Sequence, residues 1–325
     1  MTQHDIPTLT AQALIRPMRS GGSRPLLLRL EDGRTAHAKF QHNPQSTRSL
    51  AHDLIGNLIG QMVGAPVPEV VLVNVSHEDM ERLPYLTKYR WRPGLQFATV
   101  YFETGHPLKR GEVVGLTNLA DLPTCALLEA WLYNHDVKFT HILTVPGPGG
   151  PRFVILDHGF ILGGPFRPPS SLWHDRHEFP IAQPFSVMAL NAPVRFDFAS
   201  ALRRMENLTE ADLRGVLEAI PRPWGVRSKD QAAIIEFLCY RQRKLARLAR
   251  HLQEIWNANK PSAPMVEVSP ETPTNKSDMP KLVVTQAQDW VALTEDPWSS
   301  SQPRVTDESN HEEGNDLESS NNGAD

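Results

Sequence analysis

Two aspartates on either side of a predicted hairpin carry the strongest chemical signal in the sequence. Asp136 follows an amphipathic helical stretch and opens a loop, and Asp157 comes directly after a strand-like run at residues 153–156. Because a hairpin returns its end close to its beginning, we expect the two carboxylates to converge. In phosphoryl transfer, one carboxylate accepts the proton of a substrate hydroxyl and another binds the Mg²⁺ that bridges the phosphates. This chemistry predicts Asp136 as the base and Asp157 as the metal ligand, although an Asp before Gly159 is also a common turn former.

A lysine and an aspartate in the first part of the chain form a second candidate pair. Lys39 lies in a strand-like run at residues 35–40, and Asp53 lies on the helical stretch that follows. An ammonium on such a strand can bind the α- and β-phosphates of ATP, while an acid on the next helix holds it in place. A solvent-exposed lysine is the alternative, because strand side chains alternate between two faces.

Glycines precede this pair. Gly21 and Gly22 are followed by Ser23, just before the first predicted strand. Without side chains, the backbone of this segment can approach a ligand closely. The segment is therefore a candidate ligand-binding loop.

Local patterns predict the elements that must position these side chains. In the first half, Asp32-Gly33 accepts the positive φ angles of a tight turn between two strands. Apolar residues then recur at helical spacing. The expected order is a hairpin at residues 26–40, a helix at 50–62 and a strand at 70–75.

The second half of the chain is predicted to be mostly helical. A helix is expected at residues 121–133, and strands at 142–145 and 153–156 flank a loop at 146–151 that contains only Pro and Gly. Thr209 and Ser228 each precede an acid or amide by three residues and are predicted N-caps of further helices. The last helix, residues 232–256, has a basic face that we interpret as solvated. Its members are Arg241, Arg243, Lys244, Arg247 and Arg250.

Composition predicts a folded body followed by a tail. Of the 325 residues, 40% are hydrophobic, which is enough to bury a core. Residues 258–325 hold 4 Lys+Arg against 13 Asp+Glu, a net −9, which leaves +5 of the total −4 for residues 1–257. The tail is too polar to offset the entropy of ordering, so we expect disorder. Trp290 and Trp298 within it are either a docking motif or an unused apolar remnant.

The sequence argues against several classes of partner. No apolar stretch is long and uncharged enough to span a bilayer, and the N-terminus leads into no secretory signal, so we expect a cytoplasmic protein. No basic cluster interleaved with aromatics is dense enough to favour nucleic acid. Cys125 and Cys239 lie in apolar helical patterns, which suit reduced core thiols better than a disulfide or a zinc site.

Several short motifs occur in one order between about residue 15 and residue 256. They are Gly21-Gly22-Ser23-Arg24-Pro25, Ala38-Lys39-Phe40, Asn43-Pro44, Asp53-Leu54-Ile55, Gly64-Ala65-Pro66, Pro93-Gly94-Leu95, Asp157-His158-Gly159 and Ile220-Pro221. As a set they resemble the HipA-like kinases of bacteria. The resemblance implies an α+β, protein-kinase-like fold of two lobes that binds ATP and Mg²⁺ and transfers the γ-phosphate to a hydroxyl. A Ser or Thr of a protein substrate is the expected acceptor, and the oligomeric state stays open.

The resemblance also implies a division of the chain. Residues 1–103 would form a small β-rich N-lobe with one helix and the nucleotide-binding loop. Residues 104–257 would form a mostly helical C-lobe with the catalytic and metal-binding loops, and residues 258–325 the disordered acidic tail.

Roles follow from the matched positions. Gly21, Gly22 and Ser23 would cover the phosphates, Lys39 would bind them, Asp53 would anchor Lys39, Asp136 would be the base, and Asp157 the principal metal ligand.

Two positions depart from the family pattern. Asp53 stands where the family usually has Glu, so its ion pair with Lys39 requires a closer helix. His141 stands five residues after Asp136, where kinases place the Asn that binds a second Mg²⁺. Imidazole is a poorer ligand than oxygen for this hard cation.

Because of these departures, two alternatives stay open. One is a pseudokinase that keeps the fold and acts as a nucleotide-dependent binding module. The other is a metal-dependent phosphohydrolase, because adjacent His and Asp residues can hold divalent metals. Its ligands would come from His135, Asp136, His141, Asp157 and His158.

Overall fold

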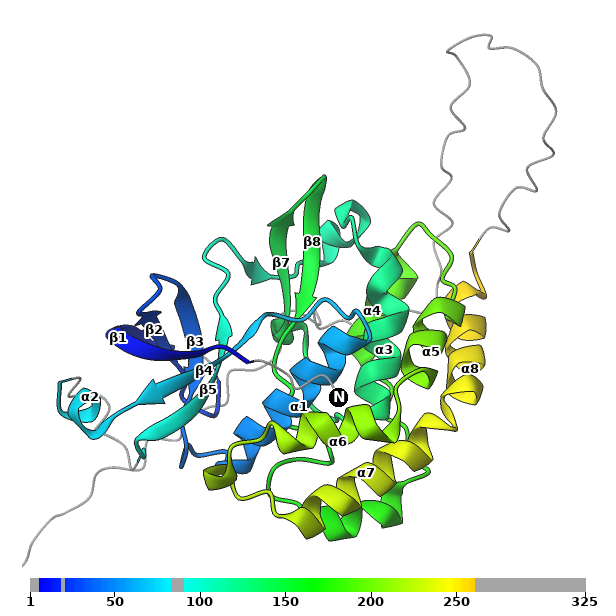
Figure 1. Ribbon diagram of the computed structural model, residues 1–325. Coiled ribbons are helices and arrows are strands. Elements are labelled where there is room, and N and C mark those ends of the chain that lie inside the picture. Colours follow the sequence, from blue (N-terminus) through cyan, green and yellow to red (C-terminus); the bar gives the residue numbers. More distant parts are fainter. Residues whose placement is uncertain (1–5, 19–20, 83–90, 261–325) are drawn as a thin grey trace, which may run out of the picture. The chain divides into compact units, whose positions relative to one another are not determined.

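The computed structural model describes residues 6–18, 21–82 and 91–260 of the chain. Residues 261–325, which hold Trp290, Trp298 and nearly all of the predicted acidic tail, lie outside these ranges. The described residues combine a closed sheet, a three-stranded sheet and a set of helices (Figure 1). The predicted mixture of α and β structure is therefore confirmed.

Five strands close into a barrel in the order β1-β2-β3-β5-β4. They are β1 (Thr8–Pro17), β2 (Leu26–Leu30), β3 (Thr35–Lys39), β4 (Val70–Val75) and β5 (Gly94–Val100). β2 and β3 form the predicted hairpin, with Leu28 opposite Ala36 and with Gly33 at a φ of +85° in the turn. β1 runs parallel to β4 and closes the barrel.

Side-chain alternation along β3 decides which way Lys39 points. Ala36 and Ala38 belong to the apolar cluster that fills the barrel. Because successive residues of a strand face opposite sides, Lys39 points out of the barrel. It points toward α1 (Arg48–Met62), where it meets Asp53.

Helix α1 is buried on all sides. It lies between the outer surface of the barrel and the helical half of the molecule (Figure 1), and its residues 49–60 are all buried. A helix of this kind can carry polar side chains only if they have partners, because an unpaired buried polar group is costly. Gly56 is needed for close packing, since a Cβ there would lie 2.3 Å from the Cβ of His158.

The remaining helices and strands form the second half of the described chain, apart from the short α2 (His77–Arg82). Its helices are α3 (Leu122–Trp131), α4 (Gln183–Asn191), α5 (Ala199–Glu206), α6 (Glu210–Glu218), α7 (Ser228–Gln242) and α8 (Leu245–Asn257). A second sheet contains β6 (His106–Pro107), β7 (Ile142–Gly147) and β8 (Gly150–Ile155). Short 3₁₀ segments are η2 (Arg110–Gly115), η3 (Leu119–Asp121), η4 (Phe139–His141), η5 (Pro169–Asp175) and η6 (Arg222–Trp224).

Several details of the predicted elements are confirmed. The helix at 50–62, the strand at 70–75 and the helix at 121–133 correspond to α1, β4 and α3. Thr209 caps α6, with its hydroxyl accepting from the amide of Asp212. Both cysteines are free, as predicted. Within the described ranges, none of the helices has the length and apolar composition needed to cross a bilayer.

The predicted loop at 146–151 is wrong in extent. β7 continues to Gly147 and β8 begins at Gly150, with Pro146 opposite Pro151. Both prolines lie one pair from the turn, near the closed end of the hairpin ladder, where few backbone donors are required. Only two residues remain for the turn, and Gly149 takes a φ of +81° within it.

The predicted single helix at 232–256 is also wrong. It consists of α7 and α8, separated at Arg243 and Lys244. α7 packs against η5 and α6, whereas α8 packs against α4 and α5, so the chain must change direction between them. The predicted cap at Ser228 is one residue late, since Arg227 precedes the first helical residue and Asp230 accepts from its amide.

Arg241 corrects the predicted basic face, because it is fully buried. Its guanidinium donates to the backbone carbonyls of Trp131, Ala130 and Glu178 and stacks over the ring of Phe179 at 4.1 Å. Burial lowers the pKa of Arg241 to about 9. The side chain therefore joins α7 to the end of α3 instead of lying in solvent.

Three elements in the first half of the chain were missed by the sequence analysis. β1, β5 and α2 were not predicted, although the barrel closes only through β1 and β5. The single helix expected in residues 1–103 is thus accompanied by α2. β1 is mostly exposed or half-buried, so its hydrophobic pattern is weak.

Truncation should show where the folded body ends. Lys260 donates to the carbonyl of Ala189 at 2.7 Å and also to that of Ala192, so packing extends three residues past α8. A chain ending at Lys260 should melt within a few degrees of the full chain. A chain ending at Asn257 should melt about 2–8 °C lower, because it loses hydrogen bonds worth about 1–2 kcal/mol. Calorimetric melting of the three chains checks this, and a large loss at Lys260 would show that residues 261–325 contribute to the fold.

Candidate active site

A cavity of about 310 Å³ lies where the barrel, α1 and the β7-β8 hairpin meet. It is lined by side chains and backbone from both halves of the described chain. Six predicted site residues contribute to its wall: Gly21, Ser23, Lys39, Asp53, His141 and Asp157. Residues 99–102, which form the end of β5 and the two positions after it, line it as well. The sequence therefore located one common cavity from segments more than one hundred residues apart.

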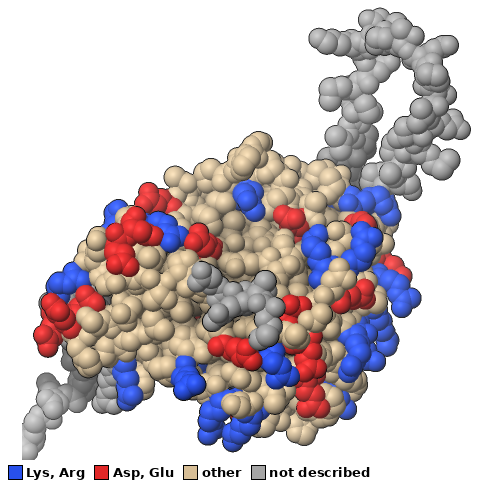
Figure 2. All heavy atoms as spheres, in the orientation of Figure 1, with Lys and Arg blue, Asp and Glu red and all other residues tan. Residues whose placement is uncertain are grey.

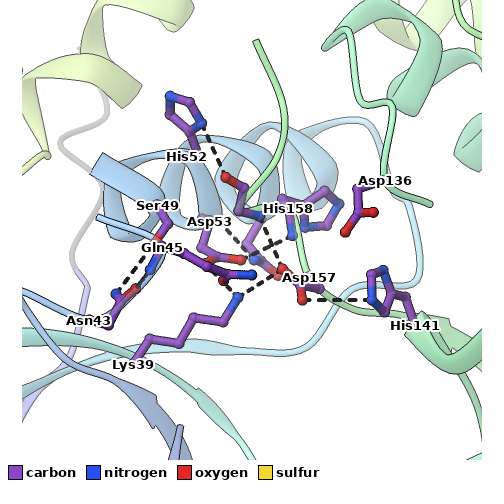
Figure 3. Close-up of polar contacts among 12 residues, drawn as sticks. Lys39, Asn43, Gln45, Ser49, His52, Asp53, Asp136, His141, Asp157 and His158 are labelled. Carbon is purple, nitrogen blue, oxygen red and sulfur yellow. Dashed lines mark hydrogen bonds and ion pairs between the residues drawn. The ribbon is translucent and has the colours of Figure 1, made fainter. Parts of the chain in front are cut away.

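Lys39 lies at the centre of the polar wall (Figure 3). Its Nζ is 2.8 Å from Oδ2 of Asp53 and 2.8 Å from Oδ1 of Asp157. Lys39 and Asp53 are almost completely buried, whereas 28% of the Asp157 side chain is exposed. The predicted ion pair with Asp53 is thus formed, and the shorter carboxylate is accommodated by the close packing of α1.

Asp53 is held from its other side by the loop after β8. Its Oδ1 accepts a hydrogen bond from the backbone amide of His158 at 3.0 Å. The preceding residue, His52, contacts the carbonyl oxygen of Gly159 with its ring at 3.3 Å. α1 therefore binds both Lys39 and the Asp157-His158-Gly159 segment.

Asp157 takes a backbone conformation that directs its carboxylate into the cavity. Its φ is +63°, in the left-handed region that Asp adopts more readily than most residues. Oδ1 also accepts from the amide of Gly159 at 3.2 Å. Oδ2 lies 3.8 Å from Nε2 of His141, too far for a hydrogen bond. This oxygen therefore remains available to a ligand.

Two carboxylates and one ammonium leave this cluster with an excess negative charge. Burial by itself lowers the pKa of Lys39, but Asp157 and Asp53 outweigh it and raise that pKa. Burial raises the pKa of Asp157, but Lys39 and His141 hold it well below its usual range. Burial raises the pKa of Asp53 to about 6 against the attraction of Lys39. A cation next to Asp157 would compensate the excess charge.

His141 and Asp136 lie beside this cluster. Burial lowers the pKa of His141, against the opposing effects of Asp157 and Asp136, so the ring is neutral near pH 7. Asp136 is not in contact with Asp157. Its carboxylate instead binds Lys138 at 2.7 Å, set back from Lys39 in Figure 3. The two predicted carboxylates thus lie in one region, but they do not touch.

Two of the three residues of the glycine segment, Gly21 and Ser23, contribute to the cavity wall. Gly21 lines the cavity with a φ of +108°, a conformation that L side chains rarely adopt. Ser23 lines it too and is buried. Gly22 instead faces Gln45, whose side chain would lie 2.6 Å from a Cβ at that position. A Cβ at Gly22 would displace the flexible end of the Gln45 side chain and would not enter the cavity wall.

Sequence reasoning missed the buried Asn57 in the cavity wall and the buried Glu129 behind it. Asn57 lines the cavity and is buried, and its Oδ1 has no hydrogen-bond partner in the described protein. It lies four residues after Asp53, which places both on one helix face and is a signal that the sequence contained. Glu129 is buried within α3 behind His158. A carboxylate inside an apolar helical run is the signal that could have found it.

The five residues of the phosphohydrolase alternative do not converge. His158 is fully buried against Glu129, and His135 packs edge-on against the ring of Tyr133 at 4.4 Å. Across the described part of the chain, no group of three or more His, Cys, Asp or Glu side chains is arranged to hold a metal by itself. Any ion here would need ligands from a second molecule, such as phosphate oxygens.

The buried ring of His52 makes folding stability depend on pH. Burial lowers the pKa of His52 to about 3 from 6.5. Below pH 6.5 the unfolded chain therefore binds a proton that the folded chain refuses. The unfolding free energy should fall with decreasing pH in that window by about 1.4 kcal/mol per pH unit from this group.

The variant His52→Gln keeps an N–H donor for Gly159 and removes the titration. In urea unfolding measured between about pH 6 and pH 4, the unfolding free energy of the variant should fall less steeply with decreasing pH, by about 1.4 kcal/mol per pH unit. Asp53 has the opposite effect on the unfolding free energy between pH 3.8 and about 6, because the folded chain raises its pKa. This contribution is present in both the wild type and the variant, so it cancels in the difference between their slopes. Equal slopes in both chains would contradict a buried neutral His52.

Comparison with known proteins adds little to this geometry. No family model and no curated protein matches the sequence. Among solved structures, the proinflammatory kinase CtkA of Helicobacter pylori has a TM-score of 0.49 at 10% identity, covering 77% of this chain and 99% of that one. A Golgi casein kinase has a TM-score of 0.49 at 13% identity, covering 79% and 76%. HipA of Shewanella oneidensis MR-1, in complex with HipB and operator DNA, has a TM-score of 0.37 at 11% identity, covering 74% and 67%. With TM-scores below 0.5, these likenesses establish neither the fold family nor the activity of the chain.

Proposed function

We propose that the chain is an ATP-dependent kinase of protein-kinase-like, two-lobed fold, which uses Mg²⁺ and transfers the γ-phosphate to a hydroxyl of a protein. The barrel with α1, residues 1–103, would be the N-lobe, and residues 104–257 the C-lobe. The observation that carries the proposal is Lys39 held at 2.8 Å by both Asp53 and Asp157 at the wall of one cavity. This arrangement matches what phosphoryl transfer requires of a phosphate-binding lysine and a metal-binding aspartate.

The residues present fit a divalent cation bound together with phosphates. Asp157 Oδ2 is uncommitted, partly exposed and adjacent to a buried negative charge, which suits a hard cation. Nε2 of the neutral His141 ring is a second donor 3.8 Å away. When bound, the cation would neutralise charge on the β- and γ-phosphates. Phosphate oxygens would complete a ligand set that the protein does not supply alone.

The chain's own residues would bind and orient the nucleotide. Lys39 would donate to phosphate oxygens from a fixed position, since both Asp53 and Asp157 restrain it. Gly21 and Ser23, which also line the cavity, would cover the phosphates. Phe97 and Leu156 also line the cavity, and their apolar surface would suit the adenine ring of ATP.

Asp136 would take the proton of the acceptor hydroxyl. Its carboxylate is 30% exposed and lies outside the cavity wall, which suits a group that must meet a second substrate. Lys138, which binds Asp136 at 2.7 Å and is itself mostly exposed, would have to release that carboxylate when the acceptor arrives. A hydroxyl acceptor on a protein fits this open side.

The pseudokinase remains a second candidate, because His141 is a weaker Mg²⁺ ligand than an oxygen. It predicts nucleotide binding without transfer. The phosphohydrolase is less well supported, because His158 and His135 face other partners.

Removal of either charged contact should weaken nucleotide binding. Lys39→Ala removes a phosphate contact and Asp157→Asn removes a metal ligand, so each should cost about 1.5–3 kcal/mol, or roughly 10- to 150-fold in Kd. Calorimetry with ATP and Mg²⁺ measures this, with Lys229→Ala, an exposed lysine elsewhere, as the matched control. Absence of ATP binding to the wild type, or unchanged affinity in both variants, would refute the nucleotide site.

Binding and chemistry should separate at Asp136 and His141. Asp136→Asn should abolish transfer from labelled ATP while ATP binding survives, because only the proton acceptor is lost. His141→Asn restores an oxygen ligand and should raise the rate of transfer without tightening ground-state binding. Transfer is measured for the three chains at several Mg²⁺ concentrations. If the wild type and His141→Asn both transfer nothing, the pseudokinase replaces the kinase, and a fully active Asp136→Asn would exclude Asp136 as the base.

A further inference from the structure

Glu129 is a buried carboxylate that the proposed chemistry does not use. It lies on α3, all of whose residues are buried, and its own exposed fraction is 3%. Oε1 is 2.9 Å from Nε2 of His158, and Oε2 accepts from the side-chain amide of Asn134 at 2.7 Å. Both carboxylate oxygens are therefore engaged by groups from two different loops.

The contact with Asn134 leads to the proposed base. Asn134 uses the other end of its side chain, Oδ1, to accept from the backbone amide of Asp136 at 3.0 Å. Its own amide donates to the carbonyl of Glu129 at 3.0 Å. The backbone that carries Asp136 is thus fixed to α3 by a fully buried asparagine.

The contact with His158 leads to the proposed metal ligand. The amide of His158 donates to Oδ1 of Asp53, whose other oxygen binds Lys39, and Lys39 in turn binds Asp157 (Figure 3). Each step is 2.8–3.0 Å long. One chain of polar contacts therefore connects the two loops that hold Asp136 and Asp157.

Burying this pair is costly, and the surrounding packing makes room for it. Removing a carboxylate and an imidazole from water is often less favourable than packing apolar side chains of the same volume. Gly56 nevertheless leaves the space that the His158 side chain occupies, since a Cβ there would lie 2.4 Å from Cγ of the ring. The ion pair between Glu129 and His158, at 2.9 Å, and the hydrogen bond from Asn134 to Glu129 can impose one geometry on the segments that they join.

We propose that Glu129 and His158 are positioning residues that set the placement of Asp136 relative to Asp157 and Lys39. This inference rests on the proposed function, because it assigns both loops to one reaction. Neither Glu129 nor His158 lines the cavity, so each acts through another residue. Positional errors of about 1 Å between reacting groups can cost about 100-fold in rate, so such a link matters for turnover more than for binding.

The variant Glu129→Gln tests the link, because it keeps the size of the side chain and removes its charge. Transfer at saturating ATP should fall about 10- to 100-fold, the scale of loss expected when reacting groups are misplaced by about 1 Å. The KM for ATP and its calorimetric Kd should change less than about 3-fold, since Lys39, Asp53 and Asp157 still hold one another. A parallel loss of ATP binding would contradict the positioning role.

Thr124→Val is the matched control for stability. Thr124 lies on the same helix, is fully buried and accepts from Arg204 at 2.6 Å, outside the network. It should lower the melting temperature and leave the rate per folded molecule unchanged.

A double variant tests whether Glu129 and His158 act as a unit. In Glu129→Gln with His158→Gln, the rate should be no lower than in the slower single variant, because the effects of residues that act as a unit are non-additive. Additive losses would overturn the proposal.

Hydrogen exchange separates failure of this inference from failure of the proposed function. Glu129→Gln should speed exchange of the backbone amides of both Asp136 and His158, and Thr124→Val should speed neither. If ATP binds and Glu129→Gln behaves like Thr124→Val in rate and exchange, the link is refuted while the kinase proposal stands. If ATP does not bind but both amides respond, the kinase proposal fails and the coupling between the loops remains.

Discussion

A buried ammonium shared by two carboxylates is the interaction on which the rest of the structure depends. Lys39 points out of the barrel, away from its core, and its ion pairs within the described ranges are those with Asp53 and Asp157, each at 2.8 Å. Breaking a buried pair by removing one partner is far more costly than never burying it. This cation therefore links the barrel, α1 and the loop after β8, because its ion pairs reach a residue of each.

The position of α1 follows from that requirement. The helix is buried all round, so polar side chains on it need partners, and the loop after β8 supplies partners for His52 and Asp53. His52 and Asp53 receive that loop, and Gly56 gives space to the ring of His158. The same contacts that satisfy buried polar groups thereby align the proposed phosphate and metal ligands, so stability and function use the same residues.

Local sequence patterns were sufficient for much of this arrangement. The Asp32-Gly33 turn, the helical spacing at 50–62 and the strand at 153–156 predicted β2, β3, α1 and β8 and placed Lys39, Asp53 and Asp157 on them. Patterns failed where the determining contacts are distant. β1 carries little hydrophobic signal because it is largely exposed, and the division between α7 and α8 depends on their different packing partners.

The sequence by itself determined which residues could do chemistry and which elements carry them, because residue type, alternation and helical spacing are local properties. Only the tertiary structure decided how those residues are partnered. It turned Arg241 inward onto backbone carbonyls, left Asp136 with Lys138 instead of Asp157, and joined Glu129 to His158 across the core. Side-chain partners of buried charges depend on which distant segments exclude water around them, and spacing along the chain does not contain that information.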